Sequence, residues 1–468
     1  MLLVVFHFIR RHWVSCIARA SRAWRAILRL VADPPPPLTS EQLKTREEEF
    51  ISSIDRDAVC ALASRYNHQK PCRIINSARG SFNVCFFVHF YTTGTKWVVR
   101  IPIEPAIYNV WEKLQSEVAT MRYIESHTKI PVPRIHAYGR SRMINCGSAT
   151  QAFLIIDWVS GRSLDMKSLV KATRERRNHF YSDLIDVLAQ LRRLEFPVAG
   201  SLMPNFKGGS EPVGKGAPRA TFNSATQLVH QNCNVLSETY RLPTEELSRQ
   251  TAELEIFALD SLEKQVPNVV DARWDDGPFV LTHTDLRCAN IIIDDDFRIR
   301  GVIDWEWAST VPRQFFTPPL WITGHALEPI HGISLDMFSE FRDVLHAKGG
   351  TSRDYEQLLH DWDFDQKLTL PMAQILRHPS SLLHVFYTFI YPGLFLEPRD
   401  KVVAKFFKDD ENGALAIEVQ RRIDISKRYT QYLKDNGLFV EDEESQKLRE
   451  WLAKGRELER KLGLTRSN

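Results

Sequence analysis

From residue 72 onward the chain breaks into short apolar runs bounded by turn residues, a pattern typical of β-strands. Runs at residues 84–90 and 97–101 are separated by a Thr-Thr-Gly-Thr turn at residues 92–95, which predicts an antiparallel hairpin. A third apolar run at residues 153–159 is followed by Gly161 and predicts a buried strand. These runs together predict a small antiparallel sheet.

Elsewhere the apolar residues recur every three or four positions, which predicts helices. A stripe of this kind covers residues 108–127 and consists of Val110, Leu114, Val118 and Met121. Residues 165–275 are mainly helical by the same spacing, and further helices are predicted over residues 39–50, 55–66, 414–435 and 441–462. The aromatic stretch 308–327 should not be helical until past Pro319.

Two apolar runs at residues 291–293 and 300–303 flank the acidic turn 294–296, which predicts a β-hairpin. The motif His283-x-Asp285-x-x-x-x-Asn290 precedes this hairpin, and Asp304 follows it. We therefore expect Asp285, Asn290 and Asp304 to meet at one end of the sheet. The acidic turn itself is interpreted as solvated surface.

A carboxylate base, an amide oxygen and a second carboxylate are the groups that metal-assisted phosphoryl transfer requires. Mg²⁺ prefers oxygen ligands and takes one or two carboxylates together with substrate phosphates. Asn290 and Asp304 are the predicted metal ligands, and Asp285 is the predicted catalytic base that orients the attacking hydroxyl. His283 is expected to be a buried structural support, not a proton carrier.

The H-x-D-x-x-x-x-N spacing with a later Asp is the catalytic-loop arrangement of protein kinases. Here Asp304 is followed by Trp305-Glu306 in place of Phe-Gly. His283-Thr284-Asp285-Leu286 with Ile303-Asp304-Trp305-Glu306 resembles the aminoglycoside phosphotransferase family, in particular its fungal branch. The resemblance covers residues 75–330, more weakly to 435. It implies an α+β, two-lobed, protein-kinase-like fold with a small antiparallel-sheet lobe and a mostly helical large lobe.

The same resemblance implies a nucleotide site in the small lobe. A loop at Gly80 and Ser81 would cover the phosphates, although it lacks G-x-G-x-x-G and a plain hairpin turn is the alternative. Arg100 stands where protein kinases carry Lys, in a Val-Arg-Ile-Pro run that fungal members share, and Lys96 is the substitute candidate. Backbone groups of residues 157–159, from Asp157 to Val159, would meet the adenine.

Glu117 lies on the apolar stripe of the predicted helix, and a carboxylate on a packed face needs a partner. Arg100 is the expected partner; the alternative is a boundary side chain that reaches solvent. In the run 360–365, acidic residues alternate with aromatic ones, as in a cation-binding wall. A solvated loop or helix edge is the favoured interpretation of that run.

The net charge is +3, and residues 1–32 carry six arginines and no acidic residue, so the rest of the chain is near −3. This distribution excludes a generally basic surface, and no nucleic-acid partner is expected. Seven cysteines without a C-x-x-C pair indicate a reducing compartment and argue against disulfides or zinc. The protein is expected to be intracellular, either cytoplasmic or mitochondrial.

Five segments are predicted along the chain. Residues 1–33 are a basic amphipathic segment, and the alternatives for it are a mitochondrial transit peptide, a surface helix, and sequence without a role. Any membrane contact would come from residues 1–30. The others are a Pro-rich linker with a helical extension at 34–70, a nucleotide-binding lobe at 71–158, a catalytic lobe at 159–437 and a charged helical tail at 438–468.

The predicted reaction transfers the γ-phosphoryl group of ATP, or another nucleoside triphosphate, to a hydroxyl of a small molecule with Mg²⁺ as cofactor. A catalytically weak or inactive nucleotide-binding pseudokinase or scaffold is the alternative, favoured by Arg100 and the sparse glycine loop. A protein kinase is disfavoured because residues 310–328 contain no Ala-Pro-Glu-like anchor. A membrane-associated interaction protein would depend on residues 1–30 alone.

Overall fold

The computed structural model describes residues 36–144, 149–204, 221–323, 335–362 and 368–440. Several sequence predictions lie outside these residues: the segment 1–33, the loop 207–218, the tail helix 441–462 and residues 363–365 of the acidic and aromatic run. The described chain belongs to two compact units. One comprises Met1–Gln42, Pro243–Leu247 and Arg422–Asn468; the other comprises Leu43–Leu242 and Ser248–Arg421.

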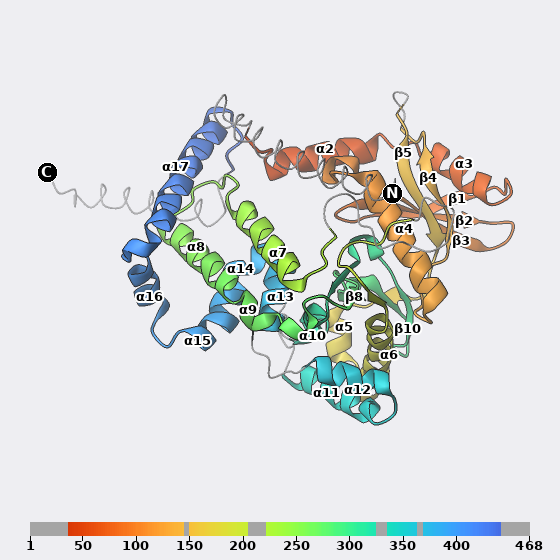
Figure 1. The fold of residues 1–468 in the computed structure, drawn as a ribbon. Coiled ribbons are helices and arrows are strands. Elements are labelled where there is room, and N and C mark those ends of the chain that lie inside the picture. Colours follow the sequence, from red (N-terminus) through yellow and green to blue (C-terminus); the bar gives the residue numbers. More distant parts are fainter. Residues whose placement is uncertain (1–35, 145–148, 205–220, 324–334, 363–367, 441–468) are drawn as a thin grey trace, which may run out of the picture. The chain divides into compact units, whose positions relative to one another are not determined.

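The second unit contains a five-stranded antiparallel sheet with the strand order β1-β2-β3-β5-β4 (Figure 1). Its strands are β1 (Arg73–Arg79), β2 (Asn83–Phe90), β3 (Thr95–Pro102), β4 (Ile135–Ser141) and β5 (Gln151–Asp157). The predicted strands at 84–90, 97–101 and 153–159 are thereby confirmed to within a few residues. β2 and β3 pair in register from Asn83 opposite Pro102 to Phe90 opposite Thr95, as a hairpin requires.

Helices cover both faces of this sheet. α3 (Arg56–Tyr66) packs on one face, where Val59 and Leu62 join Phe86 and Val99 in one apolar cluster. α4 (Val110–His127) packs on the other face, where Leu114, Val118 and Met121 are buried, so the predicted stripe is confirmed. Asn109 caps α4 because its side-chain oxygen accepts a hydrogen bond from the N–H of Glu112 at 3.3 Å. α2 (Ser40–Ser52) precedes α3.

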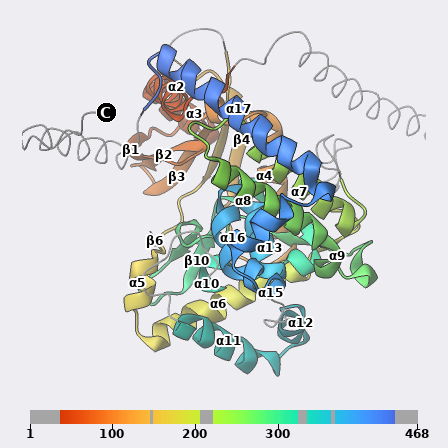
Figure 2. The same cartoon turned by 90° about the vertical axis from the view of Figure 1, so that its left-hand side faces the viewer.

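The larger lobe is mostly helical (Figure 2). It also carries two small three-stranded sheets. Strands β6 (Arg162–Ser163), β9 (Ile291–Ile293) and β10 (Ile299–Val302) form one sheet; β7 (Glu195–Phe196), β8 (Phe279–Thr282) and β11 (Ser309–Pro312) form the other. Its longer helices are α6 (Arg174–Arg192), α7 (Ala225–Tyr240), α8 (Arg249–Lys264), α11 (Leu335–Gly349), α12 (Arg353–Asp361), α13 (Thr369–Arg377) and α16 (Arg399–Phe406). The short helices are α5 (Met166–Lys171), α9 (Val266–Val269), α10 (Leu320–Thr323), α14 (Leu382–Val385) and α15 (Tyr391–Leu394). The α+β, two-lobed, kinase-like fold predicted from the sequence is confirmed.

The hairpin of β9 and β10 confirms the prediction around the acidic turn, and α10 begins directly after Pro319, as expected. The strand β11 was not expected. β11 lies in the aromatic stretch 308–327 and pairs antiparallel with β8, so Ser309 lies opposite Thr282. This pairing brings the segment after Asp304 alongside the strand that leads into the catalytic motif.

In the first unit, side-chain hydroxyls hold a short segment against α17 (Gly413–Asp435). Thr430 Oγ1 accepts a hydrogen bond from the N–H of Glu246, and Ser426 Oγ accepts one from the N–H of Leu247, both at 2.9 Å.

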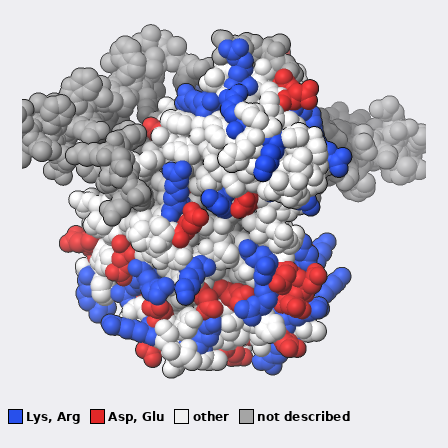
Figure 3. All heavy atoms as spheres, turned by 90° about the vertical axis from the view of Figure 1, so that its right-hand side faces the viewer, with Lys and Arg blue, Asp and Glu red and all other residues white. Residues whose placement is uncertain are grey.

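Among the described helices, none combines the length and apolar character needed to cross a bilayer. On the face drawn in Figure 3, basic and acidic side chains are interspersed in the lower part.

Gly161 connects the two lobes at a position that a side chain would disturb. Its φ is +136°, and an added Cβ would lie 2.5 Å from the carbonyl oxygen of Ile293 in β9. We expect Gly161→Ala to destabilise the protein by about 2 kcal/mol or more, because it combines backbone strain with a backbone clash. The measurement is the midpoint of urea-induced unfolding.

Gly350→Ala is the matched control, because an added Cβ there meets nothing within 4 Å. Its unfolding midpoint should stay at the wild-type value. Equal midpoints for the Gly161 and Gly350 variants would show that the connection between the lobes tolerates a side chain.

Candidate active site

The catalytic motif forms a loop between β8 and β9, within the second unit. Asn290 ends this loop, and its Nδ2 donates to the backbone oxygen of Asp285 at 2.8 Å and to the Asp285 carboxylate at 3.3 Å. A backbone oxygen only accepts hydrogen bonds, so the amide nitrogen must face Asp285. The amide oxygen of Asn290 is therefore the atom left for another ligand.

Asp304 lies beside Asn290 because the hairpin folds back on itself. The N–H of Ile303 donates to the backbone oxygen of Asn290 at 2.9 Å, which sets the two side chains at the same end of the hairpin. Asp304 adopts the left-handed conformation with φ +68° and ψ +53°. Asp and Asn tolerate this conformation better than other side chains that carry a Cβ.

His283 is buried and supports the backbone next to Asp304. Its Nε2–H donates to the backbone oxygen of Ile303 at 2.9 Å, next to Asp304. Burial lowers the pKa of His283 below its ordinary value, so the ring is neutral at pH 7. A neutral, buried ring bonded to the backbone agrees with the structural support expected for this residue.

Arg100 and Glu117 meet as the sequence predicts. Arg100 on β3 forms a buried ion pair with Glu117 on α4, so Glu117 does not reach solvent. Burial raises the pKa of the Glu117 carboxyl, and Arg100 opposes that effect. Burial alone would lower the pKa of Arg100, but three carboxylates raise it, those of Glu117, Asp304 and Glu306. Lys96, the substitute candidate, is exposed and its ammonium lies over the ring of Trp158.

Glu306 is the centre of a charge network that the sequence analysis did not identify. Its Oε2 accepts hydrogen bonds from Asn83 Nδ2 at 2.7 Å, from Arg100 at 2.7 Å and from Lys113 Nζ at 2.6 Å. These donors belong to β2, β3 and α4, so one carboxylate ties the small lobe to the segment after Asp304. The Glu that follows Trp305 was the available signal, but it was noted only as a departure from Phe-Gly.

A cavity of about 510 Å³ lies between the lobes at this network. Predicted site residues that line it are Gly80, Ser81, Arg100, Glu117, Asp157, Val159, Asn290 and Asp304. Its apolar lining includes Val98, Met121, Ile156, Ile292 and Ile303. The structure thus brings the predicted nucleotide-binding residues to one cavity, while their roles stay predictions.

Two backbone details refine the expected contacts in this cavity. The N–H of Gly80 donates to the backbone oxygen of Asn83 at 2.8 Å, so it closes the turn and does not face the cavity. This N–H is therefore already bonded within the turn, and the role of the loop at Gly80 and Ser81 in covering the phosphates stays a prediction. At the lobe connection, the N–H of Asp157 donates to the backbone oxygen of Arg134, and the N–H of Trp158 donates to that of Lys96. The N–H of Val159 makes no backbone hydrogen bond among the described residues.

The residues at the metal position fit Mg²⁺. Asn290 provides an amide oxygen, and Asp304 provides a carboxylate. Arg100 Nη2 donates to Oδ1 of this carboxylate at 2.7 Å. Mg²⁺ commonly takes one or two protein oxygens and completes its shell with phosphate oxygens and waters. The described residues contain no cluster of three or more His, Cys, Asp or Glu that would hold a metal by themselves. The donor set therefore suits a metal shared with phosphates.

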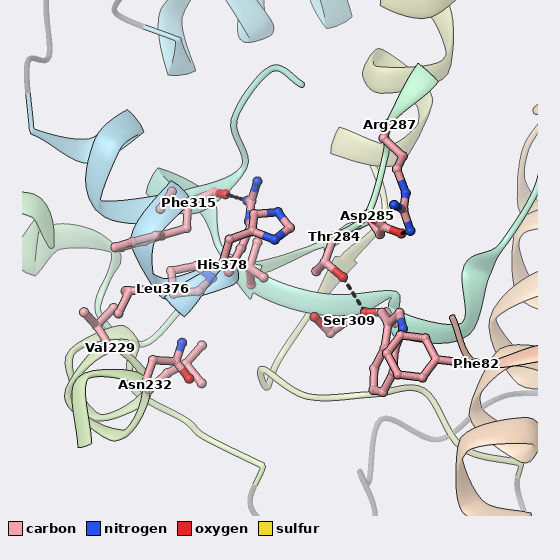
Figure 4. A pocket seen from close by; sticks show the side chains of 16 residues that line it. Phe82, Val229, Asn232, Thr284, Asp285, Arg287, Ser309, Phe315, Leu376 and His378 are labelled. Carbon is pink, nitrogen blue, oxygen red and sulfur yellow. Dashed lines mark hydrogen bonds and ion pairs between the residues drawn. The ribbon is translucent and has the colours of Figure 1, made fainter. Parts of the chain in front are cut away.

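Two further cavities, of about 560 Å³ and about 250 Å³, adjoin Asp285. Figure 4 shows the larger one, with Thr284 and Asp285 on the catalytic loop and Val229 and Asn232 on α7. Arg287 donates to Asp285 Oδ2 at 2.9 Å and lines both of these cavities as well as the one between the lobes. Asp285 and Arg287 thus mark the junction between the cavity between the lobes and its two neighbours.

Phe82 lines both the cavity between the lobes and the larger of the two cavities beside the catalytic loop. Its ring packs edge-on against Trp307 with 5.2 Å between centroids, and Lys113 Nζ lies 4.7 Å from the Phe82 ring. Sequence analysis missed Phe82, Arg287, Arg377 and His378. Phe82 follows the predicted Gly80-Ser81 loop directly, which was its only local signal.

In the described part of the run 360–365, His360 is exposed at the end of α12, as the favoured interpretation of a helix edge requires, but Asp361 and Trp362 contradict it. Asp361 is buried, with 2% side-chain exposure, and forms ion pairs with Arg192 and Arg313. Burial by itself would raise the pKa of Asp361, but the two guanidinium groups hold it below its ordinary value. Trp362 is buried beside it. At Asp361 and Trp362 this part is neither a solvated loop nor a cation-binding wall but a buried ion cluster.

Residues 84–315 match the model of the phosphotransferase enzyme family. A subtelomeric hrmA-associated cluster protein of Aspergillus fumigatus is 30% identical over 136 residues, which cover 28% of this chain and 24% of that protein. The clavilactone A biosynthesis cluster protein Y of Ampulloclitocybe clavipes is 25% identical over 221 residues, which cover 45% of this chain and 54% of that protein. The chain thus matches at most about half the length of these curated relatives.

Solved structures with a similar fold include a putative aminoglycoside phosphotransferase from Ralstonia eutropha and an ethanolamine kinase of Plasmodium vivax. The first has 16% identity and a TM-score of 0.46 and covers 81% of this chain and 99% of its own. The second has 14% identity and a TM-score of 0.42 and covers 78% of this chain and 94% of its own.

Proposed function

Residues 84–315 of this chain match the model of the phosphotransferase enzyme family, and on that basis we propose that the protein transfers the γ-phosphoryl group of ATP, or another nucleoside triphosphate, to a hydroxyl of a small molecule. The observation that carries this proposal is the position of Asp285. It lines the two cavities beside the catalytic loop and is hydrogen-bonded to Asn290, which lines the cavity between the lobes. A base at this junction can serve an acceptor on one side and a phosphoryl donor on the other.

Asp285 would orient the acceptor hydroxyl and accept its proton as the oxygen attacks the γ-phosphorus. The bonds from Asn290 and Arg287 leave the carboxylate in a defined orientation. Its side chain is 20% exposed, so it can reach an acceptor in the cavity. A carboxylate held in this way contributes by positioning as well as by basicity.

Asn290 and Asp304 would hold Mg²⁺, which supplies charge neutralisation to the phosphates when it is bound. Arg100 donates to Oδ1 of Asp304, which leaves Oδ2 for the metal. Arg100 also has two other carboxylate partners, Glu117 and Glu306, which keep it in position when the metal is bound. It then has donors to offer to phosphate oxygens.

The nucleoside would lie between the apolar side chains that line the cavity. Val98 and Ile156 come from the small lobe, and Ile292 and Ile303 come from the large lobe, which would place a planar base between two apolar walls. The N–H of Val159 would donate to the base. Ser81 would cover the phosphates from above.

A second candidate is a nucleotide-binding protein that does not transfer phosphate. It is favoured by one observation, the 2.7 Å contact of Arg100 with the carboxylate that the metal requires. If Arg100 kept Asp304 bound and so prevented it from binding Mg²⁺, nucleotide would bind without turnover. The two candidates differ in one measurable quantity, the amount of phosphorylated acceptor.

The test uses the full chain with γ-labelled ATP, Mg²⁺ and a panel of alcohol-bearing metabolites. We expect ADP and a phosphorylated alcohol to form in equal amounts, and mass spectrometry identifies the acceptor. Nucleotide binding without any labelled alcohol would favour the second candidate. Absence of nucleotide binding would contradict both.

A further inference from the structure

The residues that line the two cavities beside the catalytic loop carry more positive than negative charge. Asp285, Arg287, Arg377 and His378 line both of them. Asp285 is the one acidic residue among the described residues that line either cavity, and Arg287 already neutralises it. The remaining charge is therefore that of Arg377, with His378 beside it.

Arg377 lies at the end of α13 and is bound only to neutral oxygens. It donates to the backbone oxygen of Phe315 at 2.5 Å and to Thr317 Oγ1 at 3.0 Å. Burial lowers its pKa to about 10, so the guanidinium remains charged at neutral pH. No carboxylate forms an ion pair with Arg377 among the described residues.

Other buried or half-buried arginines of the second unit do have carboxylate partners. Arg100 pairs with Glu117, Asp304 and Glu306; Arg192 and Arg313 share Asp361; Arg177 pairs with Glu340. A charged group in a poorly solvated site is costly unless it is paired. Arg377 is thus a charged cavity residue without a carboxylate partner among the described residues.

We propose that the acceptor is an alcohol that carries a carboxylate, and that Arg377 binds this carboxylate while Asp285 receives the hydroxyl. This inference rests on the proposed function and names the class of acceptor for that same site. The walls of the larger cavity are mainly apolar, so the body of the acceptor is apolar too. The apolar residues of these walls include Leu228, Val229, Val311, Pro312, Phe315 and Leu376, while Asn232 and Ser309 add polar groups.

The donors left on Arg377 fit a carboxylate. A guanidinium has five N–H groups, and two of them are used by Phe315 and Thr317, which leaves three. Two parallel N–H groups bind a carboxylate in bidentate fashion. A polycationic acceptor would instead place its ammonium groups against Arg377 and Arg287, where like charges repel.

Matched probes test the charge of the acceptor directly. We choose 4-(hydroxymethyl)benzoate, its neutral methyl ester, 4-(hydroxymethyl)benzylamine and 4-(hydroxymethyl)phenyl phosphate, which share one alcohol and one apolar ring. Binding to the full chain is measured by calorimetry with ATP absent, and phosphorylation is measured with ATP and Mg²⁺. We expect the benzoate to bind about 30-fold more tightly than the ester and to be the best acceptor. The amine should bind weakest.

Variants then assign the effect to Arg377. Arg377→Gln should abolish the preference for the benzoate over the ester, raising KM for the benzoate more than it lowers kcat, while affinity for ATP is unchanged. Arg377→Lys should keep part of the preference because it keeps the charge. Arg353→Gln removes the same charge from an exposed site and should behave as wild type.

The outcomes separate this inference from the proposed function. Benzoate binding that depends on Arg377, without phosphate transfer, upholds the carboxylate site and contradicts the phosphotransferase proposal. Transfer with equal use of ester and benzoate, or a preference for the amine, overturns the carboxylate site and leaves the proposed function standing. Tighter binding of the phosphate, or no binding of the benzoate to the wild type, also overturns it.

Discussion

Asp285→Asn is expected to lower kcat for phosphate transfer by about 10³-fold, within the range that loss of a positioned general base produces. Asn has the shape of Asp and can still accept hydrogen bonds from Arg287 and Asn290. It lacks the charge and the basicity that assist the attacking hydroxyl. The fold and the affinity for ATP should therefore change little, and the loss should fall on kcat.

Asp295→Asn is the matched control for this variant. Asp295 is exposed in the turn between β9 and β10, ten positions along the chain, and its replacement removes the same charge. It should keep wild-type kcat. An Asp285→Asn protein that retains more than about a tenth of the wild-type rate would show that another group accepts the proton, or that the measured activity comes from a contaminating kinase.

The parts of the fold that were predicted correctly are those specified by local patterns. The stripe of Leu114, Val118 and Met121 defines α4, and the two apolar runs around the acidic turn define the hairpin of β9 and β10. The catalytic motif is equally local, because Asp285 and Asn290 are only five positions apart and bond to each other. Short-range spacing of this kind is visible in a single sequence.

The features that were missed depend on residues that are far apart along the chain. Asn83 and Glu306 are separated by 223 positions, and Arg100 and Glu306 by 206. Asp361 was expected to lie on a solvated loop or helix edge, yet Arg192 binds it from 169 positions away. The pairing of β11 with β8 is missed for the same reason. No periodicity encodes which distant partners meet.

Arg377 is the clearest case of this limit. From sequence alone, a single arginine is interpreted as a surface residue or as a helix-terminal charge, which is common and favourable at the end of a helix. Its significance appears only when Phe315, Thr317 and the cavity are assembled around it. The sequence thus suffices to propose the chemistry of the loop, while the inference about the acceptor class required the tertiary structure.

Asp304→Asn is expected to abolish measurable turnover, with a loss of about 10³-fold or more, because a carboxylate at a metal position stabilises charge by several kcal/mol. Asn is chosen because residue 304 has a φ of +68°, which Asn tolerates. Ala at this position would add about 1 to 2 kcal/mol of backbone strain and confuse loss of metal binding with loss of stability. The unfolding midpoint of the Asn variant should remain near the wild-type value.

The metal dependence of nucleotide binding gives this variant a second readout. In wild type, Mg²⁺ should increase the affinity for ATP, because Asn290 and Asp304 are placed to share the ion with the phosphates. In Asp304→Asn this increase should vanish, whereas affinity measured with a chelator should persist, because Arg100 keeps Glu117 and Glu306 as partners. A variant that still transfers phosphate would contradict the assignment of Asp304. Undiminished enhancement by Mg²⁺ would place the metal elsewhere in the cavity.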